Sequence, residues 1–415
     1  MIRKLFRNAR IFTPIDHQAP LGGAEQGRAV YFEKGAICCL NGVIEAVGEE
    51  QQVLAVVKPG ELDMEVDCGG RCLIPGFVDC HTHLCFAALR EEEFALRLAG
   101  ADYLEILQRG GGILSSVDAV RRASEEELFA ATQARVMRAL QLGTTTLETK
   151  SGYGLDPPTE LKMLRVIERL GRETPLDVVA TFMGAHAVPR EFAERPNDYV
   201  ELVIEEMIPA VAKQGVARFC DVFCEQGVFS LEQSRRILLA ARAAGLGLKI
   251  HADEVHDLGG AGLAAELHAV SAEHLLAAGD ANLAAMARAG VIAVLLPATA
   301  YSMRKSYARA ARMRELGLPL AIATDCNPGT SYTESMPFVF GLAVLNMHLS
   351  VTEALTAATL NAAYAIGMAD RVGSLEVGKS ADFLLLEGAT PAILAYHAGV
   401  SPVVEVFKRG ERQRW

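Results

Sequence analysis

The chain has 415 residues, 51% of them hydrophobic, and a formal net charge of −11. So much apolar sequence can bury a large core, and the length exceeds that of one ordinary domain. The acidic balance, with no basic stripe, argues against nucleic acid or an anionic membrane surface as a partner.

The two ends of the chain resemble each other in style. Residues 1 to about 70 contain short alternating runs broken by Gly, Asn and Pro, a pattern typical of antiparallel strands, and the C-terminal residues repeat it. Neither end is long enough to form a core alone, so we expect both to pair into one small β-sandwich domain. The predicted division places this domain on either side of a central barrel, at residues 1–70, 71–370 and 371–415.

Between these ends, short apolar runs rich in β-forming residues alternate with longer helical patterns. Runs that are apolar on both faces and separated by helices predict a parallel sheet. Eight of them, in about 250 residues, predict an α/β fold of the (β/α)8 barrel type. The eight runs are residues 77–83, 144–150, 178–186, 218–225, 246–253, 269–275, 291–297 and 320–326.

The first of these runs ends in two histidines, His81 and His83. A barrel carries its active site at the carboxyl ends of its strands. Because side chains alternate faces along a strand, both histidines point into the barrel mouth, whereas Cys80 and Thr82 point toward the helices. We therefore expect Cys80 to serve packing. Cys85 lies past the strand end, so its direction is open, and packing is again favoured.

Later runs end in further candidate ligands. His251 lies near the end of the fifth run, and Asp325 near the end of the eighth. Together with His81 and His83 they offer three imidazoles and a carboxylate, a set that suits a divalent metal with one position open for water. Such a metal lowers the pKa of a bound water to about 7 and so provides a nucleophile at neutral pH.

Several motifs carry a resemblance to a known family. PGFVDCHTH, the histidines of the fifth and sixth runs, ATD in the eighth and GSLEVGKSADFLLLE near the C-terminus resemble the amidohydrolase superfamily. Longer motifs resemble its imidazolonepropionase family: FALRLAGADYLEILQRGGGI, ETKSGYGL, TFMGAHAVP, DVFCEQGVF, KIHADE and ATDCNPGT. The resemblance implies a barrel of the metal-dependent hydrolase type. It also implies hydrolysis of 4-imidazolone-5-propanoate to N-formimidoyl-L-glutamate in histidine degradation.

The resemblance also bears on the number of metal ions. Binuclear members of the superfamily use a carboxylated lysine at the end of the fourth strand, but here that run ends in VFCE. Lys150 closes the second run instead, and we expect it to pair with Glu148 or another nearby carboxylate. We therefore expect one zinc or iron ion per chain, held by His81, His83, His251 and Asp325.

By the same resemblance, Arg90 grips the carboxylate of a small-molecule substrate, since a guanidinium can bond a carboxylate through two parallel hydrogen bonds. The alternative for Arg90 is a surface ion pair with one of the glutamates at 91–93. Tyr153 and His186 match residues that hold the ring and tail, and the alternative for each is packing. Asn327, Gly329 and Thr330 lie in a turn after the eighth run that can aim donors at the ligand. The alternative is an ordinary turn.

Three residues are candidates for proton transfer. Glu254 can position the water or take a proton from the ring, and it also counts among the substrate-binding residues. His274 can stabilise an oxyanion or shuttle a proton, and Asp325 can share the role of base. No role is assigned to the histidines outside these positions, which are His17, His256, His268, His348 and His397.

Two rival functions remain at this stage. The first is another single-metal amidohydrolase or deaminase acting on a cyclic amide or amidine, for which the same ligands would serve but Arg90 would have no carboxylate to bind. The second is a scaffold without metal, against which the intact ligand set argues. The family resemblance also favours a homodimer.

Cysteine usage and hydropathy predict the compartment. The nine cysteines are an odd number, lie mostly in apolar runs and form no C-x-x-C pair. This is typical of buried free thiols in a reducing cytoplasm. No apolar run approaches the roughly 20 residues of a membrane span, and the first residues lack the pattern of a signal peptide. We therefore expect a cytoplasmic protein with no membrane partner.

Overall fold

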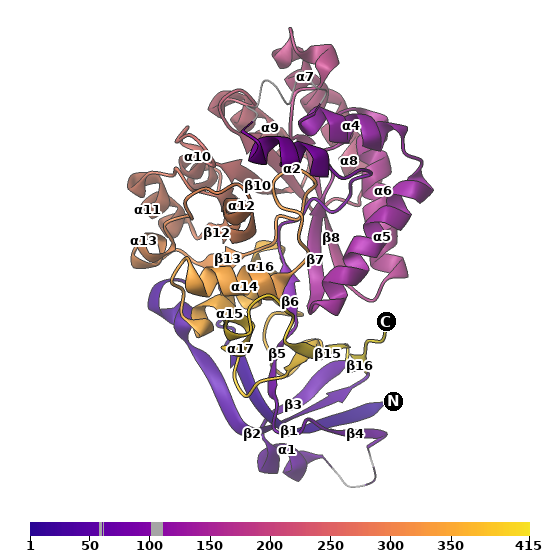
Figure 1. The fold of residues 1–415 in the computed structure, drawn as a ribbon, viewed down its shortest axis with the longest axis vertical. Coiled ribbons are helices and arrows are strands. Elements are labelled where there is room, and N and C mark those ends of the chain that lie inside the picture. Colours follow the sequence, from indigo (N-terminus) through magenta and orange to yellow (C-terminus); the bar gives the residue numbers. More distant parts are fainter. Residues whose placement is uncertain (58–59, 61, 101–110) are drawn as a thin grey trace.

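The chain folds around two sheets, seen in a computed structural model that describes all residues except 58, 59, 61 and 101–110. One is a parallel sheet of eight strands surrounded by helices, and the other is a mixed sheet built from strands of both chain ends. Figure 1 shows the helix-covered sheet above and the mixed sheet below it, with both termini beside the mixed sheet. Residues 101–110, inside one of the motifs quoted above, lie outside the described part of the chain.

All eight predicted barrel strands are present, in the sheet order β13-β12-β11-β10-β9-β8-β7-β6. Every recorded pairing between them is parallel, as their two apolar faces predicted. The α/β barrel expectation is therefore confirmed. The strands are β6 (Phe77–Asp79), β7 (Thr144–Lys150), β8 (Asp177–Ala185), β9 (Phe219–Cys224), β10 (Gly247–Ala252), β11 (Ser271–His274), β12 (Ile292–Leu295) and β13 (Leu320–Ile322).

The first and last strands meet beyond their regular ends, where the chain has already left strand geometry. The backbone N–H of Asp325 donates to the carbonyl oxygen of His81 at 3.0 Å, and that of His83 donates to the carbonyl of Cys326 at 3.0 Å. These two bonds nearly close the barrel at its carboxyl end. They also bring the histidines of the first strand directly beside the aspartate of the last.

Some of the helices between the strands begin at residues that favour helix starts. Ser124 caps α5 and Ser230 caps α9, each through a reciprocal capping box. The barrel helices are α2 (Glu91–Leu98), α4 (Ile113–Arg122), α5 (Glu125–Gln141), α6 (Pro157–Glu173), α7 (Pro196–Leu202), α8 (Ile208–Gln214), α9 (Leu231–Ala243), α10 (Gly260–Glu266), α11 (Asp280–Ala289), α12 (Pro297–Ser302), α13 (Ala310–Glu315), α14 (Met336–Leu345), α15 (Val351–Ala358) and α16 (Leu360–Ala365).

The mixed sheet joins both ends of the chain, as expected, in the order β16-β15-β14-β5-β1-β2-β3 with β4 on β1. Its strands form one connected sheet. The prediction that all its N-terminal strands are antiparallel was wrong, since β4 and β5 run parallel to β1. The strands are β1 (Arg3–Pro14), β2 (Ala29–Leu40), β3 (Val43–Glu49), β4 (Met64–Asp67), β5 (Cys72–Pro75), β14 (Phe383–Leu386), β15 (Val403–Lys408) and β16 (Glu411–Arg412).

This sheet has its own aromatic core, and charges tie it to the barrel. Phe6 packs edge-on against Phe383, with ring centroids 4.8 Å apart. At the start of β8, the carboxylate of Asp177 pairs with Lys408 at 2.6 Å and Arg409 at 2.7 Å. The division into domains at residues 70 and 371 stays a prediction, and β5 lies just past the first of these boundaries.

Most of the hydrophobic side chains are buried in the core. Among the helices that the structure describes, none is long and apolar enough to cross a membrane.

Candidate active site

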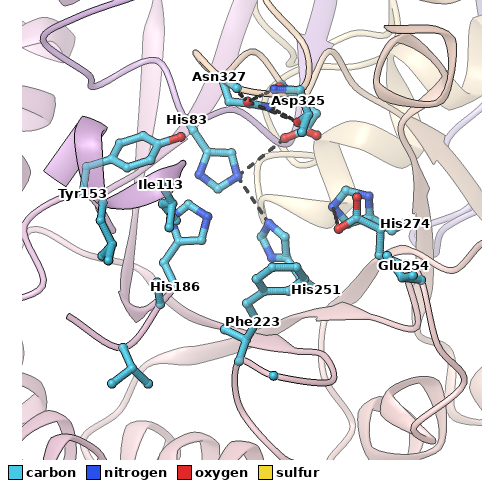
Figure 2. A pocket seen from close by; sticks show the side chains of 18 of the residues that line it. His83, Ile113, Tyr153, His186, Phe223, His251, Glu254, His274, Asp325 and Asn327 are labelled. Atoms are coloured by element: carbon cyan, nitrogen blue, oxygen red, sulfur yellow. Dashed lines mark hydrogen bonds and ion pairs between the residues drawn. The ribbon is translucent and has the colours of Figure 1, made fainter. Parts of the chain in front are cut away.

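A cavity of about 540 Å³ opens at the carboxyl ends of the barrel strands, and four of the histidines predicted there line it, namely His83, His186, His251 and His274. Figure 2 shows His83 and His251 in its middle, Tyr153 and His186 on one side, and His274 and Glu254 on the other. The cavity therefore brings together side chains from the first six strands and the eighth, or from the segments that follow them, as expected of a barrel active site.

The candidate metal ligands converge at the floor of this cavity. The ligand nitrogens of His81, His83 and His251 lie within 4.8 Å of one another. The Nε2 atoms of His83 and His251 face each other at 3.3 Å. One carboxylate oxygen of Asp325 lies 3.5 Å from Nε2 of His81 and 3.6 Å from Nε2 of His83.

The tautomer of His251 follows from its partner. Its Nδ1 lies 3.0 Å from Oδ1 of Asp221, and a carboxylate can only accept, so Nδ1 carries the proton and Nε2 keeps a lone pair. Burial lowers the pKa of His251, but the Asp221 carboxylate outweighs it and raises the pKa above its ordinary value. Burial would raise the pKa of Asp221, but the neighbouring His251 and Lys150 outweigh it and lower that pKa far below its ordinary value.

The donor set fits a divalent metal ion. Both ring nitrogens of His81 and Nδ1 of His83 are buried without a hydrogen-bond partner in the described structure. Buried polar atoms rarely stay unpaired, so a missing partner requires an explanation. Burial also lowers the pKa of both rings well below the ordinary value, which keeps them neutral and able to coordinate.

The carboxylate of Asp325 is held from behind. Oγ1 of Thr299, on α12, donates to its second oxygen at 2.6 Å, which leaves the first oxygen toward the histidines. The backbone of Asp325 is left-handed, with φ of 51°, and that of His274 is left-handed as well, with φ of 71°. Non-glycine residues adopt this conformation at a cost, and such residues cluster at functional sites.

A network of buried charges lies among the barrel strands near the ligands. Lys150 pairs with Glu148 at 2.5 Å and with Asp221 at 3.0 Å, and all three side chains are fully buried. The predicted pairing of Lys150 with Glu148 is thereby confirmed. The same network includes Lys249, which lies 3.8 Å from Glu273.

Arg90 forms the ion pair with a neighbouring glutamate that was its alternative role, and it also lines the cavity, while its bond to a substrate carboxylate stays a prediction. It lines the cavity, and its side chain is only 14% exposed. It also pairs with Glu93, since its Nε donates to a carboxylate oxygen of Glu93 at 2.9 Å and its Nη2 donates to the other. The guanidinium is therefore fixed beside the cavity rather than free in solvent.

Tyr153 and His186 form the wall next to His83. The ring centroids of His186 and His83 lie 4.9 Å apart in a stacked arrangement, and those of His186 and Tyr153 lie 5.2 Å apart. Nδ1 of His186 donates to the carbonyl of Gly152 at 3.0 Å, so its Nε2 is left as an acceptor. Burial, and after it the neighbouring His251, lower the pKa of His186 to about 3, which keeps this ring neutral.

The turn after β13 is built around Asn327. Its side-chain oxygen accepts from the N–H of Gly329 at 2.8 Å and of Thr330 at 2.7 Å, and its Nδ2 donates to the carbonyl of Asp325 at 2.7 Å. The amide is therefore used within the turn. All three predicted turn residues line the cavity, and the Asn327 amide shapes the turn that places them there.

Glu254 and His274 lie opposite Tyr153. A carboxylate oxygen of Glu254 is 3.7 Å from Nε2 of His274, and the Glu254 side chain is 22% exposed to the cavity mouth. Nδ1 of His274 is buried without a hydrogen-bond partner in the described structure. A carboxylate and an imidazole at this distance can exchange a proton through small movements.

The loop that carries Glu254 is anchored by two carboxylates. Glu225, at the end of β9, accepts from the N–H of Val255 at 2.9 Å and from Nδ1 of His256 at 2.8 Å. Asp253 accepts from three backbone N–H groups of the following segment, at 2.9 to 3.0 Å. Glu254 therefore projects from a short segment held on both sides.

Sequence reasoning missed several residues of the site. Asp221 lies in the middle of β9, and an acidic residue in an otherwise apolar strand was the signal that could have identified it. Thr299, Ile113 and Leu114 carried no such signal. The two cysteines near the histidines are fully buried in core clusters, which confirms packing for Cys80 and Cys85.

Residues 72–412 match the amidohydrolase family. Solved structures share the fold at low identity. Guanine deaminase of E. coli has a TM-score of 0.74 at 16% identity and covers 99% of both chains. An adenosine deaminase from Xanthomonas campestris with bound zinc has a TM-score of 0.72 at 19% identity and covers 99% of this chain and 92% of its own. The chain therefore belongs to the amidohydrolase family.

Curated relatives narrow the assignment. An imidazolonepropionase of Syntrophobacter fumaroxidans is 68% identical over 414 residues, which cover 100% of this chain and 98% of the relative. An imidazolonepropionase of Desulfotalea psychrophila is 64% identical over 412 residues, which cover 99% of this chain and all of the relative. Within the amidohydrolases, the chain groups with the imidazolonepropionases.

Proposed function

We propose that this chain opens the ring of 4-imidazolone-5-propanoate to give N-formimidoyl-L-glutamate, with one zinc or iron ion held by His81, His83, His251 and Asp325. The observation that carries this proposal is the layout of the cavity. Four potential ligand side chains converge at its floor, and the guanidinium of Arg90 lines the same cavity. A substrate with a hydrolysable ring and a carboxylate tail matches this layout, with its ring at the ligand cluster and its tail at Arg90.

A divalent ion at these ligands would supply a water nucleophile at neutral pH and polarise the ring carbonyl. The ligand set itself does not select zinc over iron, since imidazole and carboxylate suit either. Asp221 would fix His251 in the tautomer that coordinates through Nε2, and Thr299 would orient the carboxylate of Asp325.

Arg90 binds the propanoate tail in this proposal, beside the backbone of Gly329 and the side chain of Thr330. His186 accepts a ring N–H through its free Nε2, and the hydroxyl of Tyr153 donates to the ring or tail. Asn327 holds the turn that brings Gly329 and Thr330 to the tail. A nucleobase has no carboxylate for Arg90, so the alternative of a deaminase leaves this cation without a partner.

The chain's own residues then move the protons. The water oxygen bonds to the ring carbonyl carbon, the carbon–nitrogen bond breaks, and the released nitrogen gains a proton. Glu254 removes the proton from water and passes it on, with Asp325 as the neighbouring base. His274 donates to the carbonyl oxygen as negative charge develops there, which is the role that its position opposite Tyr153 supports.

The test is turnover of the purified, metal-loaded protein. Loss of the imidazolone absorbance and formation of N-formimidoyl-L-glutamate are expected, with no turnover after chelation or in the His251→Ala variant. Turnover that survives both treatments would refute the metal-assisted reaction. No turnover by protein with one metal per chain would refute the substrate.

We also infer a homodimer in the cytoplasm that binds a small carboxylate and no nucleic acid. The cytoplasm is supported by nine cysteines that are all free and buried. The net charge of −11 supports the absence of nucleic acid. The dimer rests on the family resemblance and is tested by light scattering of the purified protein.

A further inference from the structure

We propose that Glu93 sets the preference for a carboxylate-bearing substrate by holding Arg90 so that one edge of the guanidinium faces the cavity. This rests on the proposed function, in which Arg90 binds the tail. Glu93 would be a positioning residue, because it acts through Arg90 and does not itself line the cavity.

The two side chains meet along one edge of the guanidinium. Nε of Arg90 donates to Oε2 of Glu93 at 2.9 Å, and Nη2 donates to Oε1. This paired geometry fixes the plane of the guanidinium as well as its position. It occupies Nε and one hydrogen of Nη2, and leaves the outer edge, formed by Nη1 and the other hydrogen of Nη2, without a bonded acceptor in the described structure.

The outer edge lies against the substrate-binding turn. A Cβ atom added at Gly329 would come within 2.6 Å of Nη1 and 3.1 Å of Cζ of Arg90. Both residues line the cavity, so the guanidinium rests against a residue with no side chain and is exposed to the cavity beside it. A second carboxylate can therefore bond the outer edge while Glu93 keeps the inner one.

Glu93 is itself held in place. Its Oε2 also accepts the N–H of Gly112 at 2.8 Å, and its side chain is only 12% exposed. Gly112 precedes α4, whose first residues Ile113 and Leu114 line the cavity. The carboxylate thus joins the arginine to the neighbouring wall, whereas the adjacent Glu91 and Glu92 are exposed.

Two effects of Glu93 on Arg90 predict opposite changes in anion binding when Glu93 is replaced. A carboxylate beside Arg90 offsets part of its positive charge, so electrostatics alone predict that removing Glu93 would strengthen binding of an anion. Orientation predicts the opposite, because a long side chain without its partner must be ordered by the substrate itself. The sign of the effect therefore separates the two.

The experiment measures binding by calorimetry to the zinc-loaded protein. The probes are 3-(imidazol-4-yl)propanoate, which is not hydrolysed, and its neutral amide. Glu93→Gln should raise the Kd of the acid about tenfold, as expected for the loss of one hydrogen bond to a charged group, and leave that of the amide unchanged. Glu92→Gln is the matched control and should bind both probes like the wild type.

An unchanged or lower Kd of the acid in Glu93→Gln would overturn the proposal. Equal weakening of both probes would also overturn it, because it would indicate that Glu93 only stabilises α2. If that variant fails to fold, Glu93→Asp serves instead, since its shorter carboxylate cannot reach both Arg90 and Gly112. A wild type without preference for the acid would overturn the role of Arg90 as well. If only Glu93→Gln lost the preference for the acid over the amide, the role of Glu93 would be supported and the proposed reaction would be unaffected.

Discussion

His251 donates its Nδ1 proton to Asp221 across 3.0 Å, and its other nitrogen faces Nε2 of His83 at 3.3 Å. One buried carboxylate thus determines which nitrogen of His251 is free to coordinate. The same carboxylate pairs with Lys150, so a charge network buried within the barrel reaches the ligand cluster.

Replacing Asp221 with Asn should weaken metal binding. The amide can present its NH2 group to Nδ1 and so favour the wrong tautomer, and changes of this kind cost about 10- to 100-fold in metal affinity. Competition with a chelator of known affinity measures the effect, and thermal unfolding of the variant checks that it folds. An affinity equal to that of the wild type would contradict the role given to Asp221.

Replacing Glu225 with Gln should lower kcat with little change in KM. The Glu225 carboxylate accepts hydrogen bonds from the N–H of Val255 and from Nδ1 of His256, next to Glu254. In glutamine, one of the two oxygens becomes an NH2 group, which would face these donors with a donor. Misplacing a catalytic group by about 1 Å can cost about 100-fold in rate.

The control for this prediction is His256→Asn, which removes the ring from the pair but keeps the backbone donors bonded to Glu225. Its kcat should stay near that of the wild type. If both variants lost activity equally, the anchoring of the Glu254 segment by Glu225 would not be the cause.

Replacing Gly329 with Ala should raise KM about tenfold and leave kcat nearly unchanged. The new Cβ would come within 2.6 Å of Nη1 of Arg90 and push the guanidinium away from the tail. Gly171→Ala is the control, because a Cβ there meets Val178 at an ordinary 3.6 Å. Steady-state kinetics measure both, and an unchanged KM in Gly329→Ala would argue against tail binding at this wall.

Replacing Asp177 with Asn should destabilise the protein near neutral pH. Burial favours the neutral carboxyl, but Lys408 and Arg409 outweigh it and lower the pKa of Asp177. A lowered pKa means that the stabilisation is complete above the unfolded value of about 3.9 and is lost as the pH falls through the folded value.

The difference in unfolding free energy between the wild type and Asp177→Asn should therefore be on the order of 1–3 kcal/mol at pH 7 and shrink below about pH 4. Urea unfolding at a series of pH values measures it, with the exposed Asp198→Asn as control. A difference that grew in acid would reverse the sign of the argument.

The barrel and the positions of its strand-end residues could be predicted from the sequence because both follow local rules. Eight apolar runs between helical patterns predicted the sheet, and alternation along the first strand placed His81 and His83 on one side. The strand ends gave His251 and Asp325 for the same reason. These four residues then lie close together in the fold because parallel barrel strands end at the same edge.

Pairings between distant segments could not be predicted. Asp221 bonds His251 from a neighbouring strand, and β4 and β5 pair with β1 in parallel, although each run alone fitted an antiparallel strand. Arg90 had two alternatives that its sequence context could not separate; the fold shows the ion pair with Glu93 beside the cavity, and the bond to substrate stays a prediction. The bonding of the Asn327 amide inside its own turn was not predicted either, and the contact of this cavity-lining residue with substrate stays a prediction.

The central claim is that one metal ion per chain, at His81, His83, His251 and Asp325, supports ring opening. The most direct measurement adds zinc or iron(II) in steps to metal-free protein and follows the rate of 4-imidazolone-5-propanoate hydrolysis at each step. We expect a linear rise that levels off at one equivalent per chain. A rate that keeps rising to two equivalents, or one that is already full without metal, would contradict it.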